Sequence, residues 1–144
     1  MKLKQFIFLS AFIYFNANAA TDYSVAESNC IAWSPEVING EFSYSFSPAI
    51  AYGGGIQTSF MAFNIKGKSQ EHIDTVIQSK VNGRSISFAI QGYGDTIIFR
   101  PQEKSDTKFI LDAATTGSLA FNGMVFKTGG TKTIVNYMLA QCKE

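Results

Sequence analysis

The sequence predicts a mainly β domain: an antiparallel sandwich or barrel with one C-terminal α-helix. Aromatic residues and serines alternate along residues 41–47, Asn-Gly pairs at 82–83 and 122–123 separate short apolar runs, and an amphipathic pattern follows the glycines at 129–130. Alternation at period two is typical of half-buried strands, and Asn-Gly favours tight hairpin turns. Several short strands followed by one helix indicate an antiparallel sheet on which that helix packs.

The first two long strands are expected over residues 41–47 and 56–65. Pro48 ends the first strand, because proline cannot donate to the hydrogen-bond ladder, and three glycines at 53–55 begin the loop before the second. Apolar residues occupy both faces of the second run, so this strand is covered on both faces or bulged.

Residues 73–81 allow two interpretations. As a helix, the segment has Ser69 as a cap and Gly83 as a terminator. As a strand, it leads into an Asn-Gly turn and buries one consistent face. Five of its nine residues are β-branched, which lowers helix propensity and favours the hairpin. The facing pairs expected in that hairpin are Thr75 with Ile90, Ile77 with Phe88, and Ser79 with Ile86.

The second half of the chain is expected to alternate short strands with turns. Residues 91–95 form a turn and residues 102–107 a loop. Thr131 caps the final helix, which packs on the sheet. The expected strands are 96–100, 108–112, 118–121 and 124–127, and the expected buried face of the helix is Ile134, Val135, Met138, Leu139 and Cys142.

Residues 1–19 have the pattern of a signal peptide. Lys2 and Lys4 precede an apolar stretch, and Ala17-Asn18-Ala19 matches a small-x-small cleavage site. The apolar run is too short to span a membrane, which needs about 20 residues. We therefore expect a single exported domain over residues 20–144, soluble and without a membrane span.

The chain has two cysteines, Cys30 and Cys142. In an oxidising compartment this pair predicts one disulfide that joins the two ends of the domain. Two buried free thiols are the alternative. Redox catalysts use a close C-x-x-C spacing, so the pair is interpreted as structural.

The composition argues against several classes of function. A net charge of +1 without basic runs does not favour nucleic-acid binding. A single histidine, His72, expected to face solvent, and the absence of a phosphate-binding loop predict no metal, no cofactor and no catalytic residues. Most acids, including Asp106, are expected in solvated loops, and Asp112 is the one acid expected to merit attention for an altered environment.

Recognition through loops is the remaining class, and two loops carry a tyrosine beside glycines. The candidate partner-binding residues are Tyr52, Gly54, Tyr93, Gly94 and Asp95. Tyrosine at a loop tip suits protein interfaces because it offers a large contact at low entropic cost. The alternative is that both tyrosines are half-buried and the glycines serve only turn geometry. The aromatic stripe at 42, 44 and 46 is expected in the core, or otherwise on a partner or homodimer surface.

The overall plan resembles that of periplasmic immunity proteins against type VI secretion effectors, and of periplasmic lysozyme inhibitors. The resemblance rests on the signal peptide, the single disulfide, the β-rich chain and an ending in which Phe121 to Phe126 and Gly129-Gly130 precede a helix that closes on Cys142. It implies a periplasmic protein that inhibits a peptidoglycan hydrolase, with a loop or the Tyr93 hydroxyl entering the sugar-binding cleft. The Ser-Gly-x-x-Tyr loop of one inhibitor family is absent, so no inhibitory residue is carried over. A secreted structural or adhesive subunit and a small-ligand carrier are the alternatives.

Overall fold

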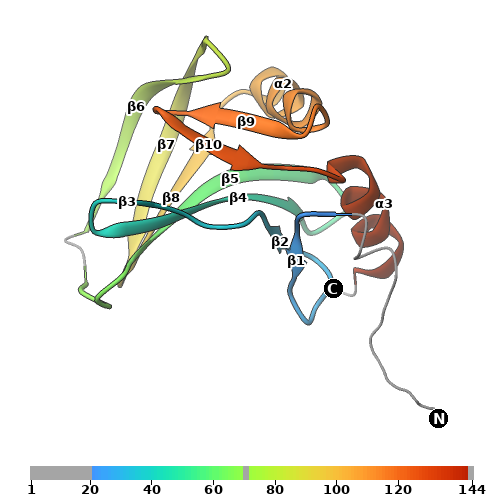
Figure 1. The fold of residues 1–144 in the computed structure, drawn as a ribbon, viewed down its shortest axis with the longest axis horizontal. Coiled ribbons are helices and arrows are strands. Elements are labelled where there is room, and N and C mark those ends of the chain that lie inside the picture. The colour runs from blue at the N-terminus through green and yellow to red at the C-terminus, as the bar shows by residue number, and fades with distance from the viewer. Residues whose placement is uncertain (1–20, 70–71, 143–144) are drawn as a thin grey trace.

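A computed structural model describes residues 21–69 and 72–142, and the expected signal peptide at residues 1–19 lies outside this range. The described chain forms an eight-stranded antiparallel sheet in the order β10-β9-β6-β7-β8-β5-β4-β3, curled into a nearly closed barrel (Figure 1). The prediction of a mainly β, barrel-like fold is therefore confirmed. The prediction of one helix is wrong, because two helices, α2 and α3, lie among the described residues.

Three short strands, β1 to β3, come first in the chain, and five long strands, β4 to β8, follow them. The chain ends with helix α2, the β9–β10 hairpin and helix α3. The long strands β4 to β8 form most of the barrel wall, and β1 pairs with β2 as a separate two-stranded sheet. The bounds are β1 Ser24–Val25, β2 Ala32–Trp33, β3 Val37–Asn39, β4 Phe42–Ile50, β5 Ile56–Asn64, β6 Asp74–Val81, β7 Arg84–Tyr93, β8 Thr96–Pro101, α2 Lys104–Ala114, β9 Ser118–Phe121, β10 Met124–Lys127 and α3 Thr131–Gln141.

The β6–β7 hairpin has the predicted register. Thr75 pairs with Ile90, Ile77 with Phe88 and Ser79 with Ile86. Asn82 and Gly83 both have positive φ, 47° and 84°, as a type I′ turn requires. The strand interpretation of this segment is thus confirmed, and the helix alternative is wrong.

Pro48 does not end β4, contrary to expectation, but lies inside it and pairs with Thr58 of β5. On the edge of β4 that faces away from β5, the Phe46 carbonyl accepts the Ser34 N–H and the Ile50 N–H donates to the Cys30 carbonyl. The missing N–H therefore falls on that outer edge, where proline is tolerated. The Ala32 carbonyl on this edge accepts a hydrogen bond from the Ser47 hydroxyl (2.8 Å), which replaces the backbone donor that proline lacks.

Residues 108–112 belong to a helix, so the strand expected there is wrong. The loop expected over 102–107 is confirmed only at residues 102–103, because the helix begins at Lys104. Helix α2 buries Asp106, Ile110 and Ala114, which recur every fourth residue and thus share one face. This face packs against β5, β8 and β9. The apolar run at 109–111 was too short to distinguish a buried strand from a helix.

The core is a cluster of phenylalanines inside the barrel. Phe60 is fully buried and stacks on Phe121, with ring centroids 4.0 Å apart, and it also contacts Phe46, Phe88 and Phe126. These rings come from β4, β5, β7, β9 and β10, so the cluster holds both halves of the barrel together. In the stripe expected as core, Phe46 is fully buried, whereas positions 42 and 44 are half-buried.

Helix α3 is joined to the N-terminal segment by the predicted disulfide. Cys30 and Cys142 are bonded with their Cα atoms 4.7 Å apart, which confirms the pairing. Gly130, with φ 80°, is the N-cap in place of Thr131, which is instead the first helical residue. Leu139 is exposed, so its expected place on the buried face is wrong.

A buried hydroxyl cluster fixes the start of α3. Thr131 Oγ1 donates to the Thr128 carbonyl (2.6 Å) and lies 2.7 Å from the Tyr23 hydroxyl. Thr128 Oγ1 donates to the Ala114 carbonyl at the end of α2 (2.7 Å). The threonine at 131 is therefore used to join three segments and not to cap a helix.

Candidate functional site

Tyr52 lies at the tip of the loop between β4 and β5. Its side chain is 93% exposed, the highest value among the large apolar and aromatic side chains of the described residues. The loop is closed by hydrogen bonds from the Ala51 N–H to the Gly55 carbonyl (2.7 Å) and from the Gly54 N–H to the Ala51 carbonyl (2.9 Å). Gly53 and Gly54 adopt φ of 93° and 92°, which side chains disfavour. The tyrosine is thus presented outward on a tight loop.

Tyr93 is less free to act as a donor. It is the last residue of β7, 57% exposed, and its hydroxyl donates to Gln91 Oε1 (3.0 Å). The same oxygen accepts a hydrogen bond from Arg100 Nη1 (2.9 Å). The hydroxyl that was expected to enter a partner's sugar-binding cleft is therefore hydrogen-bonded to a neighbouring side chain of its own sheet.

Gly94 and Asp95 form the turn that follows Tyr93. Gly94 has φ 58°. The Asp95 carbonyl accepts the Asn64 N–H (2.8 Å), and its Oδ1 accepts the Thr96 hydroxyl (3.1 Å). Asp95 thus holds the turn against the end of β5.

The two candidate loops lie at opposite ends of the barrel wall. Strands β4 and β5 pair from Ile50 with Ile56, next to Tyr52, to Phe42 with Asn64, next to the Asp95 turn. Nine paired residues correspond to about 27 Å at about 3.4 Å per step. The structure therefore does not bring the five candidate residues together: Tyr52 and Gly54 lie at one end, and the other three at the far end.

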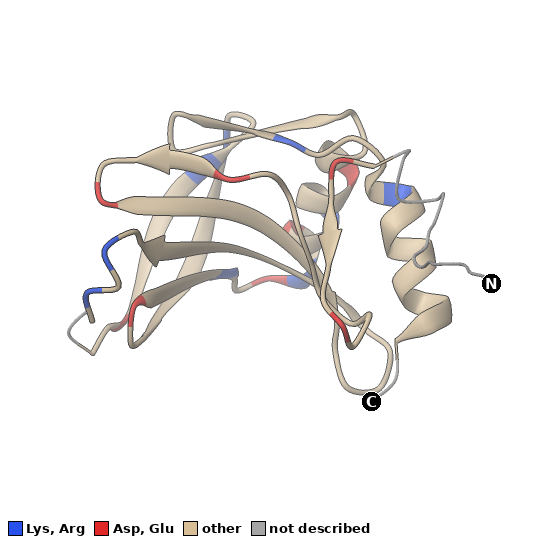
Figure 2. Ribbon diagram, turned by 60° about the horizontal axis from the view of Figure 1, so that its bottom comes forward, with Lys and Arg blue, Asp and Glu red and all other residues tan. Residues whose placement is uncertain are grey.

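Tyr93 belongs to a row of uncharged side chains on the outer face of the sheet. Cross-strand pairing places Ile38, Ser43, Phe63, Thr96 and Tyr93 side by side on one face. Residues 42–65 contain no Asp, Glu, Lys or Arg, and charged positions gather in turns and near strand ends (Figure 2). This outer face therefore presents little charge to a partner.

No protein-family model, curated protein or solved structure matches this chain. The function is therefore inferred from the geometry of its own residues.

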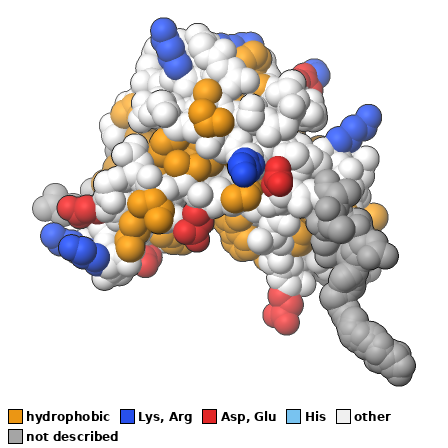
Figure 3. Space-filling view, viewed as in Figure 1, with side chains coloured by type: hydrophobic (Ala, Val, Ile, Leu, Met, Phe, Trp, Pro, Cys, Tyr) orange, Lys and Arg blue, Asp and Glu red, His pale blue; other side chains and the backbone are white. Residues whose placement is uncertain are grey.

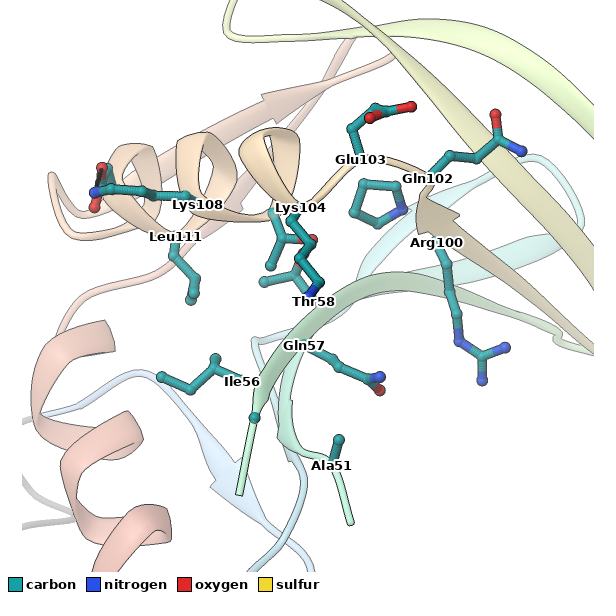
Figure 4. Close-up of a pocket in the computed structure, with 14 residues that line it drawn as sticks. Ala51, Ile56, Gln57, Thr58, Arg100, Gln102, Glu103, Lys104, Lys108 and Leu111 are labelled. Carbon is teal, nitrogen blue, oxygen red and sulfur yellow. Dashed lines mark hydrogen bonds and ion pairs between the residues drawn. The ribbon is translucent and has the colours of Figure 1, made fainter. Parts of the chain in front are cut away.

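A cavity lies beside the Tyr52 loop. It has a volume of about 700 Å³ and is bounded by α2, the end of β8 and the start of β5, with Ala51 and Gly55 of the loop on its rim (Figure 4). Sequence reasoning missed it because the wall formed by α2 was expected as a loop and a strand. The buried positions of this wall recur at i, i+4, but the first of them is Asp106, so no apolar period marked the helix in the sequence.

The acids around α2 differ from their expected roles. Asp112 is exposed and its Oδ2 pairs with Lys108 Nζ (3.0 Å). Asp106, expected in a solvated loop, is only 8% exposed and pairs with Arg84 Nη2 (3.0 Å). The Arg84 guanidinium also lies 4.7 Å from the centre of the Phe109 ring. Arg84 therefore attaches α2 to β7, a structural role.

The inner face of the barrel is partly open where β6 diverges from β9, since these two strands pair only at Val81 and Phe121. Apolar side chains are visible between β6 and β3 (Figure 3). Tyr44, half-buried on this inner face, has its pKa raised by burial, which disfavours the charged phenolate.

His72 is exposed, just ahead of β6. Residues 21–69 and 72–142 contain no group of three or more His, Cys, Asp or Glu side chains placed to hold a metal. None of the helices in these ranges is long and apolar enough to cross a membrane.

Proposed function

We propose that this chain is an exported, periplasmic binding protein that inhibits a cell-wall-degrading hydrolase, as periplasmic immunity proteins do, and that the Tyr52 loop enters the cleft of the hydrolase. The observation that carries the proposal is the near-complete exposure of Tyr52 on a loop closed by its own backbone hydrogen bonds. An exposed aromatic side chain at the tip of a hairpin can fill a concave partner site.

The base of this loop is rigid, which favours tight binding. The Ile50 N–H donates to the Cys30 carbonyl (2.8 Å), and Cys30 is tied to Cys142 by the disulfide. The loop is therefore anchored to α3 as well as to the sheet. A pre-organised loop loses little conformational entropy on binding, so more of the contact energy appears as affinity.

The chemistry of the loop suits a carboxylate-lined cleft. Glycoside hydrolases act with a pair of Asp or Glu residues. The Tyr52 hydroxyl makes no hydrogen bond to any described residue and can donate to such a carboxylate. The loop itself carries no acidic residue, since residues 42–65 contain neither Asp nor Glu.

A lysis assay tests the proposal. The full-length protein and a form without residues 1–19 are expressed in bacteria that export a peptidoglycan hydrolase, preferably one encoded beside this gene. Only the full-length form is expected to protect. Lysis that proceeds unchanged with the folded, oxidised full-length protein would contradict the inhibitory function.

Two tyrosine variants separate the loop from the rest of the proposal. Tyr52→Ala is expected to weaken inhibition by about 30-fold, the value of a 2 kcal/mol interface residue. Tyr93→Ala is the matched control, since it removes an exposed tyrosine at the opposite end of the same wall. Equal inhibition by wild type and Tyr52→Ala would remove the loop from the proposal while leaving the inhibition intact.

A structural subunit that assembles through sheet edges has less support. The edge strands β3 and β10 have three and four residues, and they lie close to each other at the seam of the barrel. Such short edges offer few backbone groups for pairing with another chain.

A further inference from the structure

The cavity beside α2 contains a buried hydroxyl without a partner. Thr58 points inward from β5 and is 3% exposed, and its Oγ1 has no hydrogen-bond partner among the described residues. It lines the cavity together with Thr107 of α2. A buried hydroxyl without a partner costs about 1–3 kcal/mol, so a ligand that supplies the partner recovers that cost on binding.

One positive charge is directed into the same space. Figure 4 shows the Lys104 side chain descending from the first turn of α2 toward Thr58, between α2 and β5. Lys104 forms no ion pair with any of the described residues. The amine and the Thr58 hydroxyl together suit a negatively charged oxygen ligand.

The other charged residues on the rim are accounted for elsewhere. Lys108 pairs with Asp112, and Arg100 donates to Gln91 on the outer face. Glu103 points away from the cavity in Figure 4. Lys104, which is exposed at the rim, is therefore the cavity's one cation that is not paired with another side chain of the described residues.

The remaining wall is apolar. Leu111 of α2 and Ile56 of β5 point toward each other across one side of the cavity (Figure 4), and Pro101 lines another part. A second, smaller hollow of about 380 Å³ continues past Leu111 toward Val135 of α3. An aliphatic chain can lie along this surface and bury its methylene groups, each worth about 0.8 kcal/mol.

We propose that this cavity binds an aliphatic monocarboxylate, with the carboxylate between Lys104 and Thr58 and the chain against Leu111 and Ile56. The exposed Lys104 ammonium pairs with the carboxylate at the rim of the cavity. The Thr58 hydroxyl, which is buried in the free protein, donates to the carboxylate once this side chain turns into the cavity. The volume of about 700 Å³ falls in the range of small-molecule sites, about 300–1,000 Å³. The site is independent of the proposed hydrolase inhibition, and either proposal stands if the other fails.

Calorimetric titration of the oxidised protein without residues 1–19, with octanoate as the probe, tests the site. Lys104→Gln is expected to weaken octanoate binding by about ten-fold or more, since a hydrogen bond to a charged group contributes about 1.5–3 kcal/mol. Lys127→Gln, on β10 and outside the cavity lining, is the matched control and is expected to leave the affinity unchanged. Acetate, which lacks the chain, is expected to bind far more weakly than octanoate.

Thr58→Val provides a second readout that a purely structural role would not give. The substitution removes the hydroxyl and keeps the shape, so it is expected to raise the unfolding temperature of the free protein while weakening octanoate binding. Absence of octanoate binding to the folded protein, or equal affinity in wild type, Lys104→Gln and Thr58→Val, would overturn the proposal. Binding of octylamine as tight as that of octanoate would also overturn it, because the site would then not select a carboxylate.

Discussion

Replacing both Cys30 and Cys142 with serine is expected to lower the free energy of unfolding by about 4.8 kcal/mol. The disulfide closes a loop with a sequence separation of 112. The chain-entropy relation, −2.1 − 1.5R ln n cal/mol/K, gives a loss of about 16 cal/mol/K for the unfolded chain, or about 4.8 kcal/mol at 25 °C. A domain of this size has a total stability of about 5–15 kcal/mol, so the variant is expected to be only marginally stable.

The folded state itself is expected to survive this change. Asp22 and Gly129 exchange hydrogen bonds of 2.8 Å, which hold the N-terminal segment to the start of α3 without the disulfide. Removing the disulfide therefore lowers stability mainly by increasing the conformational entropy of the unfolded chain. Urea unfolding followed by the fluorescence of the single tryptophan, Trp33, should show a midpoint about 2.4 M lower, taking a slope of about 2 kcal/mol/M.

Wild type unfolded under reducing conditions is the control, and it should match the double serine variant. A loss below about 1 kcal/mol in both samples would refute the reasoning, because it would mean that the unfolded chain is not expanded by opening a loop of this length.

Three further outcomes are expected from equilibrium unfolding measurements. Burial raises the pKa of Tyr23 above its ordinary value of 10.0. The stability that the neutral phenol contributes is therefore complete below pH 10 and is lost as the pH rises above 10. The Tyr23→Phe variant, which also loses the bond to Thr131, should be less stable than wild type at pH 7, but its stability should fall less steeply in alkali. Asp106→Asn should cost about 1–2 kcal/mol, less than a fully buried pair, because the Arg84 side chain is 46% exposed; a midpoint equal to wild type would contradict the structural role. Phe60→Ala should cost about 3–5 kcal/mol, because it leaves a cavity among four other rings, and a cost below 1 kcal/mol would be inconsistent with this core.

The hairpin of β6 and β7 could be predicted in detail because its information is local. Asn82 and Gly83 specify the turn, and the turn sets which residues face each other. The burial of Ile77 opposite Phe88 then follows from the period of the strand. Turn chemistry and hydrophobic pattern agree in this segment, so one register remains.

Helix α2 could not be predicted because its pattern depends on a distant residue. Its buried face begins with Asp106, which interrupts the apolar pattern. The aspartate is buried only because Arg84, 22 positions earlier, supplies the opposite charge. Sequence analysis could not pair these two side chains without the fold.

The candidate site was predicted only in part for the same reason. Tyr52 was identified from its glycine-rich loop, which is local information. The cavity beside it depends on α2 and on Thr58, whose inward direction follows from the barrel. That Tyr52 and Tyr93 lie far apart depends on strand order, which the sequence pattern does not contain.

Pro48 also bears on what happens when the N-terminal segment detaches. If residues 30–34 separate from β4 after reduction of the disulfide, the edge of β4 that faces away from β5 becomes exposed to other chains. An exposed edge of this length would ordinarily act as a template for aggregation. The proline interrupts its row of N–H donors, so an incoming strand cannot pair along the whole edge. The proline within β4 thus protects a partly opened chain against edge-to-edge association.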